Sequence, residues 1–281
     1  MSADTLETLD TAEASWLAWR ADRAAGLRAP RGVLSLTSHH WLGAEPAPVV
    51  GVPGLWWADD DGAHVRVDGD GAVTDGDVAV LLDAEALAPV TGTRTVVVAE
   101  AGSAVPFVVG DIGVELALRT GRYLLRTRDP HAPALAAFVA AGEGVVVPAF
   151  GFDPAQVRDL PVRWYAGPRA AVVDGAKPGL VHHVQVVGEV DLDGTTLRLV
   201  AGHHGGATLS FTDRAEGAPE WRAVHVADAE VEASRRTGTL RVDLNRASAY
   251  PSHFNDHGTC PRPLAGNDLP FAVEAGEKDP R

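Results

Sequence analysis

The sequence has a single cysteine, Cys260, in 281 residues. One thiol cannot form an intrachain disulfide, so burial and hydrogen bonding must stabilise the fold. Lysine is almost as scarce, because Lys177 and Lys278 are the two lysines among 24 basic residues. The 38 acidic residues give a formal net charge of −14. This charge argues against nucleic acid and anionic membrane as partners, since neutralising phosphates needs clustered Lys and Arg.

Long apolar runs are missing as well. No stretch approaches the roughly 18 uninterrupted apolar residues of a membrane-spanning helix. The first residues, Met-Ser-Ala-Asp-Thr-Leu-Glu, lack the basic and apolar regions of a secretory signal. A composition of 46% hydrophobic and 22% charged residues is typical of a globular domain. We therefore expect a soluble, cytoplasmic protein.

Three common motifs are absent from the chain: the Gly-x-Ser-x-Gly nucleophile elbow, the Walker A loop and the Gly-x-Gly-x-x-Gly dinucleotide fingerprint. The sequence therefore indicates no particular cofactor. It also leaves open whether the protein is an enzyme, and which oligomeric state it adopts.

The hydrophobic pattern predicts a mainly β fold, an antiparallel barrel or sandwich with an N-terminal amphipathic helix over residues 4–28. Short β-branched runs separated by Asp-Gly turns predict the strands. The predicted strands are residues 33–37, 63–67, 95–100, 114–120, 123–128, 170–173, 184–191, 196–201, 207–212 and 240–244. The Ala-rich run at 133–141 predicts a second, short helix. With no repeat or linker visible, we expect residues 1–30 to pack on a single β-rich domain spanning 31–281.

Six of the eleven histidines form adjacent pairs, His39-His40, His182-His183 and His203-His204. Neighbouring residues of a strand point to opposite faces, so each pair could turn one imidazole inward. Three inward imidazoles and a carboxylate would form a zinc or iron site. The usual metal-ligand spacings are absent, so we assign no metal ligand and keep this as an alternative.

The C-terminal segment is dense in Pro, Asn, His and Asp, which disfavours a regular helix or a central strand. We expect it to be an ordered clasp over the domain, with residues 271–274 as a closing strand. In this interpretation Asp243 and Asn245 accept amides of the loop at 250–263, and Asn267 braces its far end. Glu277 and Lys278 are expected on the solvated surface. Cys260, near His253 and His257, is either a nucleophile or a small residue in a turn.

Several segments carry a family resemblance. They are residues 31–42, Arg126-Thr127-Arg128-Asp129, Phe211-Thr212-Asp213, Cys260-Pro261-Arg262-Pro263, Asn267-Asp268-Leu269 and Ala275-Gly276-Glu277-Lys278. In this order they resemble a bacterial family of uncharacterised proteins, domain of unknown function 1684, over roughly residues 16–278. The resemblance implies a shared fold and a shared pocket, and no reaction. Ser252 stands where relatives usually carry a second cysteine, so a cysteine pair cannot serve this chain as a disulfide or as metal ligands. Residues 219–222 also replace a Gly-rich Thr-Tyr segment.

Two main hypotheses for the function remain. The first is a protein that binds a small molecule in a pocket between the His39-His40-Trp41 block and the C-terminal loop. The second is a non-enzymatic structural or interaction domain, and a His-ligated metal-dependent hydrolase is a further alternative. The candidate ligand-binding residues are His39, His40, Trp41, Arg128, Asp129, Asp243, Asn245, Cys260 and Asn267.

Overall fold

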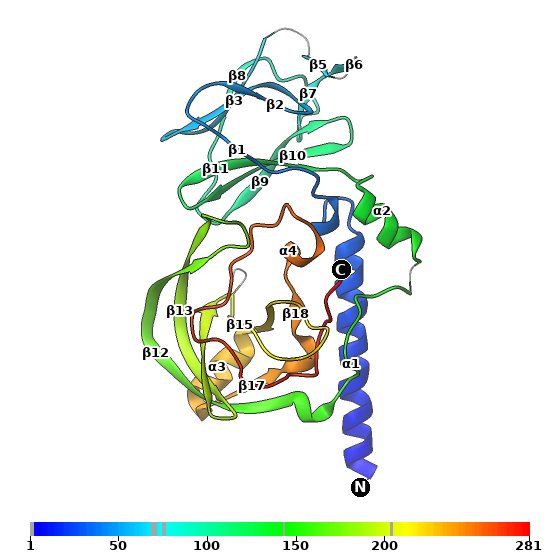
Figure 1. Cartoon of the computed structure of the whole chain (residues 1–281), viewed down its shortest axis with the longest axis vertical. Helices are drawn as coiled ribbons and strands as arrows, with labels where there is room; N and C mark the ends of the chain where they lie inside the picture. The colour runs from blue at the N-terminus through cyan, green and yellow to red at the C-terminus, as the bar shows by residue number, and fades with distance from the viewer. Residues whose placement is uncertain (1–2, 69–71, 75–76, 143, 203–204) are drawn as a thin grey trace. The chain divides into compact units, whose positions relative to one another are not determined.

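A computed structural model describes residues 3–68, 72–74, 77–142, 144–202 and 205–281 (Figure 1). The chain divides into two compact units. Unit 1 joins Met1–Gly26 to Gly144–Arg281, and unit 2 is Leu27–Glu143. Each unit buries an apolar cluster of its own. Residues 27–143 contain one of these clusters, and the single β-rich domain expected over residues 31–281 stays a prediction.

Unit 1 is built on a seven-stranded sheet with the order β17-β12-β13-β14-β15-β16-β18. Its strands are β12 (Val157–Asp174), β13 (Val181–Leu192), β14 (Thr195–Ala201), β15 (Ala207–Phe211), β16 (Arg222–Val226), β17 (Thr239–Asp243) and β18 (Ser248–Ala249). In Figure 1, β12 and β13 are long curved strands. The ladders between these described strands are antiparallel. The sheet has two ends in its hydrogen-bonded order, so it is not closed into a barrel.

Three helices belong to unit 1. Helix α1 (Ala3–Arg28) runs from unit 1 into the first residues of unit 2, α3 is Asp228–Thr237, and α4 is a single turn at Pro251–Phe254. Short 3-10 turns lie at Pro154–Gln156 (η2) and Leu244–Arg246 (η3). Figure 1 shows α3 close to β17, which follows it in the chain. Val231 of α3 packs into the main core of unit 1, so this helix closes one side of that core.

The β13–β14 hairpin follows directly from the sequence. Asp193 and Gly194, between the strands, both have positive φ, 51° and 82°. Two positive φ values give the type I′ turn whose twist matches that of paired strands, and Asp-Gly favours it. The predicted hairpin at 184–201 is therefore confirmed. Within the same sheet, Gly188 faces Trp164, and a Cβ at Gly188 would lie 2.8 Å from the Trp164 ring.

Unit 2 is a sandwich of two antiparallel sheets. One has the order β1-β11-β10-β9-β7, the other β2-β3-β4-β8. Its elements are η1 (Val33–Ser35), β1 (His40–Trp41), β2 (Ala47–Val49), β3 (Val52–Asp59), β4 (Gly62–Val67), β7 (Leu81–Asp83), β8 (Gly92–Val96), β9 (Ser103–Val109), β10 (Ile112–Arg119), β11 (Arg122–Arg128) and α2 (Pro133–Ala140), with a small β5–β6 pair at Ala72–Thr74 and Asp77–Ala79. Side chains of both main sheets share one buried cluster around Trp56 and Leu116. The mainly β prediction, the sandwich, the N-terminal helix and the short second helix are confirmed.

Two predicted strands are wrong, and the strand predicted at 95–100 already ends at Val96. Residues 33–37 instead contain the 3-10 turn η1, because the Ser35 hydroxyl donates to the Gly32 carbonyl at 2.7 Å and favours a local turn over extended chain. Residues 271–274 form no ladder, although Asp268 and Glu277 on either side make isolated bridges. Helix α3 was missed. In the described part of the chain, no helix is both long and apolar enough to cross a membrane.

Candidate functional site

The tail of unit 1 is held by a buried ion pair. Arg222 begins β16 and is fully buried. Its Nε and Nη2 donate to Oδ2 of Asp213 at 3.1 and 2.9 Å. The remaining Arg222 protons go to the backbone carbonyls of Val273, Ala275 and Glu277. Because these three carbonyls accept hydrogen bonds from a side chain, they are not available to the N–H groups of a neighbouring strand. The tail therefore forms no β-strand here. Burial lowers the pKa of Arg222, and the Asp213 carboxylate opposes that shift.

Glu277 is buried as well, so its expected place on the solvated surface is wrong. Its carboxylate accepts hydrogen bonds from Arg23 Nε at 3.0 Å and from the Ala249 backbone at 2.7 Å. Gly276, just before it, has a φ of +77°, and a Cβ there would collide with the Ala247 carbonyl. The Ala-Gly-Glu part of the terminal signature therefore has a structural cause, since it lets the tail pass close to η3 and reach Arg23 of α1.

Asn267 braces the tail as predicted. Its Nδ2 donates to the carbonyls of Arg198 and Ser210 at 2.9 and 2.8 Å, and its Oδ1 accepts from the Arg198 N–H at 2.8 Å. The side chain is 2% exposed. With these three bonds Asn267 links β14 to β15, which is a structural role.

Asp243 and Asn245 hold a different loop from the one expected. Asn245 exchanges two hydrogen bonds with the backbone of Asp153, at 3.0 and 2.9 Å. Asp243 Oδ1 accepts from the backbone N–H and from Nδ2 of Asn245. The Asn245 carbonyl accepts the indole N–H of Trp16 on α1. The pair therefore ties α1 and the segment before β12 to η3, and not the loop at 250–263.

The remaining predicted residues of unit 2 form a separate group. His40 and Trp41 pair with β11, and the ring of His39 lies edge-on to Trp41 at 5.2 Å. Arg122 stacks over Trp41 at 4.5 Å.

Arg128 and Asp129 are engaged with the backbone at the end of β11. Arg128 donates to the carbonyls of Arg31 and Gly32, and Asp129 Oδ1 accepts the backbone N–H of His131. Arg128 also pairs with the buried Glu115 at 2.9 Å. Burial alone would raise the pKa of Glu115, but Arg126 and Arg128 outweigh burial and hold that pKa below its usual value.

The histidine pairs and Cys260 do not come together as a metal centre in the described residues, where no group of three or more His, Cys, Asp or Glu side chains is placed to hold an ion. His182 and His183 lie on β13 of unit 1, and His39 and His40 lie in unit 2. His203 and His204 are outside the described residues. Cys260 is half-buried, and its carbonyl accepts from the Ala176 N–H at 2.8 Å.

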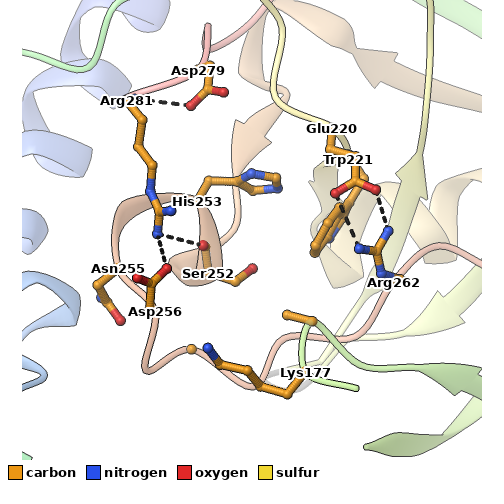
Figure 2. A pocket seen from close by; sticks show the side chains of 12 residues that line it. Lys177, Glu220, Trp221, Ser252, His253, Asn255, Asp256, Arg262, Asp279 and Arg281 are labelled. Atoms are coloured by element: carbon orange, nitrogen blue, oxygen red, sulfur yellow. Dashed lines mark hydrogen bonds and ion pairs between the residues drawn. The ribbon is translucent and has the colours of Figure 1, made fainter. Parts of the chain in front are cut away.

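One pocket of unit 1 combines a cavity with polar atoms that lack partners. It encloses about 290 Å³, and Figure 2 shows its lining. We call it the Ser252 pocket. Its lining residues are Ala176, Lys177, Glu220, Trp221, Ser252, His253, Asn255, Asp256, Gly258, Arg262, Asp279 and Arg281.

Local structure brings these residues together. Helix α4, a turn opened by Pro251, carries Ser252 and His253. Gly258 folds back against this turn so closely that a Cβ would lie 2.8 Å from the Ser252 Cα. Pro261 bridges to Gly175, which places the loop with Lys177 alongside the tail.

Three atoms of this lining are buried and find no hydrogen-bond partner among the described residues: Trp221 Nε1, Ser252 Oγ and His253 Nε2. Trp221 and His253 are 3% and 8% exposed, and their rings meet edge-on at 4.4 Å. In Figure 2 the His253 imidazole points from α4 toward Trp221. Burial lowers the pKa of His253, opposed mainly by Asp279 and Glu220, so the ring favours the neutral form.

Ion pairs surround this centre. Arg262 pairs with Glu220 and stacks over Trp221 at 4.4 Å, which covers one face of the indole. Arg281 pairs with Asp256 at 3.0 Å and donates to the Ser252 carbonyl. Both pairs are substantially exposed, so the mouth of the pocket is lined by solvent-exposed charged side chains.

Trp221, Ser252 and His253 are not among the site residues predicted from the sequence. In the sequence, His253 is notable only as a neighbour of Cys260, and Ser252 only as the replacement for a cysteine. The lack of partners that marks these atoms is a property of the folded chain. The one available signal was the concentration of polar residues in the turn-rich segment 250–263, where sites tend to lie.

The model of the family described as "Protein of unknown function (DUF1684)" matches residues 145–278. This range contains the whole β-sheet of unit 1 and most of the Ser252 pocket, and it begins after the segments 31–42 and 126–129. No curated protein matches the chain. Among solved structures, the solution NMR structure of an uncharacterised protein of Haloarcula marismortui is similar, with 20% identity, a TM-score of 0.35, and coverage of 48% of this chain and 77% of that one. The match to the DUF1684 family model over residues 145–278, a little under half of the chain, confirms the resemblance that the C-terminal signature predicts.

Proposed function

We propose that the protein binds a small polar molecule in the Ser252 pocket. One observation carries the proposal: three buried polar atoms without partners among the described residues belong to side chains that line one cavity, those of Trp221, Ser252 and His253. A buried polar atom without a partner costs about 1–3 kcal/mol, so native proteins keep few of them. Three in one place are typical of a site that keeps its hydrogen-bonding capacity for a ligand.

This proposal keeps part of the pocket predicted from the sequence. The C-terminal loop supplies half of the lining, including Ser252, His253 and Gly258. The contribution of the His39-His40-Trp41 block stays a prediction, and so do the binding roles of Arg128 and Asp129. The side chains of Asp243, Asn245 and Asn267 form hydrogen bonds with backbone groups, which favours a structural role for these three residues.

A structural role of the tail is supported by a separate observation, the buried contacts of Arg222 and Glu277 with the last residues. It is compatible with ligand binding, because the clasp and the pocket use different side chains. The tail then has two tasks: residues 273–277 complete the core, and residues 252–262 line the pocket.

The indole N–H signals in a proton–nitrogen NMR spectrum test the binding proposal. A library of small molecules of mixed charge is added to the intact chain, and the Trp221 signal is assigned from its loss in Trp221→Phe. Because its Nε1–H has no partner in the protein, a bound ligand should shift this signal strongly. The Trp164 indole is the internal control, since its N–H is already donated to Ser234 Oγ at 2.9 Å.

A ligand that moves the Trp221 signal, leaves the Trp164 signal in place and fails to act on Ser252→Ala supports the proposal. If no member of the library moves the Trp221 signal at millimolar concentration, the pocket is not a ligand site and the proposal is overturned.

A further inference from the structure

We infer that the ligand of the Ser252 pocket is inorganic phosphate in its monohydrogen form. The inference rests on the proposed function and names the chemistry of that same pocket. Four side chains of the lining offer hydrogen-bond donors or acceptors to a ligand: Lys177, Trp221, Ser252 and His253. The ligand is identified as the one whose own acceptors and donors match them.

His253 supplies the acceptor. A hydrogen bond between the imidazole and the backbone of Trp221 raises the pKa of His253. A hydrogen bond has this effect when the ring N–H is the donor, so the acceptor is the Trp221 carbonyl. Since Nε2 has no partner, this N–H is on Nδ1. A neutral imidazole with the proton on Nδ1 carries a lone pair on Nε2. Nε2 therefore needs a ligand atom that donates a proton.

The other three side chains are donors. The Trp221 indole can only donate, the Ser252 hydroxyl donates to any acceptor oxygen, and the Lys177 ammonium has three protons. No ion pair within 4 Å is found for Lys177 in the described part of unit 1. Three donors and one acceptor match the four oxygens of a monohydrogen phosphate, three of them bare and one protonated.

Outside the two ion pairs, the charges of the lining leave one cation, Lys177, whose charge also acts on Asp256, and one carboxylate, Asp279. Glu220 is paired with Arg262 and Asp256 with Arg281. The carboxylate of Asp279 accepts the backbone N–H of Arg281, and Figure 2 shows it at the opposite end of the pocket from Lys177. Lys177 is thus the available counter-ion, and the end of the pocket nearest Lys177 suits the anionic oxygens.

The pocket should therefore distinguish phosphate from sulfate. The two ions have the same shape, but near neutral pH sulfate has no proton to give to Nε2. Its oxygen would face the lone pair, and one buried hydrogen bond would be lost. We expect sulfate to bind at least about tenfold more weakly, which corresponds to about 1.4 kcal/mol.

The distinction should disappear in acid. Once Nε2 is protonated it donates, and either anion satisfies it. The groups that face His253 are Asp279, Glu220 and Arg281, with Trp221 against the ring, and Lys177, Arg262 and Asp256 complete the charged lining. Sulfate binding should therefore strengthen as pH falls below 6.5, the ordinary pKa of histidine, because burial lowers the pKa of His253.

Isothermal titration of the intact chain with sodium phosphate, sodium sulfate and glycerol 3-phosphate at pH 7.5 and pH 5 tests the inference. The expected result at pH 7.5 is binding of inorganic phosphate and at least tenfold weaker binding of sulfate. Glycerol 3-phosphate loses its last proton near pH 6, so at pH 7.5 it should bind as weakly as sulfate. In His253→Gln the amide can either accept or donate, so sulfate and phosphate should bind equally. Trp164→Phe is the matched control and should keep the distinction.

Equal binding of sulfate and phosphate by the unchanged protein at pH 7.5 would overturn the inference and leave the proposed function standing. The same conclusion would follow if the protein bound neither phosphate nor sulfate while another molecule shifted the Trp221 indole signal. If neither ion binds and no molecule shifts that signal, both proposals fail. Loss of the distinction in Trp164→Phe would place the binding elsewhere and also overturn the inference.

Discussion

The Arg222 guanidinium donates two hydrogen bonds to one carboxylate oxygen of Asp213, and neither side chain is more than 1% exposed. The second oxygen, Oδ1, accepts the backbone N–H groups of Val273 and Ala215. Every N–H of the Arg222 guanidinium and both oxygens of the Asp213 carboxylate have hydrogen-bond partners. The buried pair therefore connects the β15–β16 loop to the tail. The Phe-x-Asp segment of the family resemblance therefore marks an anchor for the C-terminal residues.

Asp213→Asn should destabilise unit 1 strongly, because it leaves the Arg222 charge buried without a counter-ion. Removing one partner of such a pair costs about 3–5 kcal/mol. The free energy of unfolding in urea measures the effect. Glu232→Gln is the control, since Glu232 and Arg235 form an exposed pair, and its effect should stay within about 1 kcal/mol. Similar losses in the two variants would contradict the anchoring role of Asp213.

Deleting every residue after Asn267 should unfold unit 1. The deletion removes Val273 and Ala275 from the core and takes Glu277 away from Arg23. Amide proton dispersion in an NMR spectrum reports the outcome. Deleting only residues 279–281 is the control and should leave a well-dispersed spectrum, because these residues add no apolar cover. A soluble, dispersed product of the longer deletion would show that the tail is dispensable for folding.

Stability should fall above pH 10 through Tyr250. Burial raises the pKa of Tyr250 to about 12, against 10.0 for an ordinary tyrosine, and its hydroxyl lies 2.7 Å from Ser210 Oγ. The unfolded chain loses this proton first, so the contribution of Tyr250 is complete below pH 10 and is lost between pH 10 and 12. The loss amounts to about 2–3 kcal/mol. Urea unfolding from pH 9 to 12 should show a shallower decline in Tyr250→Phe, and identical declines would refute the assignment.

Gly258→Ala should damage the Ser252 pocket. The added methyl would sit 2.8 Å from both the Cα and the N of Ser252, and neither backbone atom can move without shifting α4. We expect a loss of about 1–3 kcal/mol, typical of overpacking, together with a shift of the Trp221 indole signal. Gly151→Ala is the control, because a Cβ there meets nothing within 4 Å. If Gly258→Ala and Gly151→Ala lose the same free energy of unfolding and leave the Trp221 signal in place, Gly258 is not required for the turn.

The sequence predicted those parts of the fold that depend on local signals. Asp193-Gly194 and the flanking β-branched runs predicted the central hairpin, and the helical spacing of residues 4–28 predicted α1. Helix α3 was missed although Asp228 in its first turn and Gly238 at its end are helix signals. The predicted closing strand failed for a non-local reason, since Arg222, fifty residues earlier in the chain, binds the carbonyls that a strand would have offered.

The candidate site was harder to predict than the fold. Asp243, Asn245 and Asn267 were selected from the sequence for their polar side chains, and their binding roles stay predictions. Their backbone partners, Asp153, Arg198 and Ser210, are distant in sequence. Trp221, Ser252 and His253 could not be selected in advance. A tryptophan or a serine is noteworthy there only once the fold has buried it beside a cavity without a partner.

The two-unit organisation has a consequence for how the chain is made. Trp16 of α1 docks on the carbonyl of Asn245, 229 residues later. At about 5–20 residues per second, a ribosome needs roughly 10–50 s to synthesise that interval. For this time the first helix has no surface to pack on, while residues 27–143 can already complete their own core. The nascent chain thus carries α1 without its docking surface while residues 27–143, which bury an apolar cluster of their own, are already synthesised.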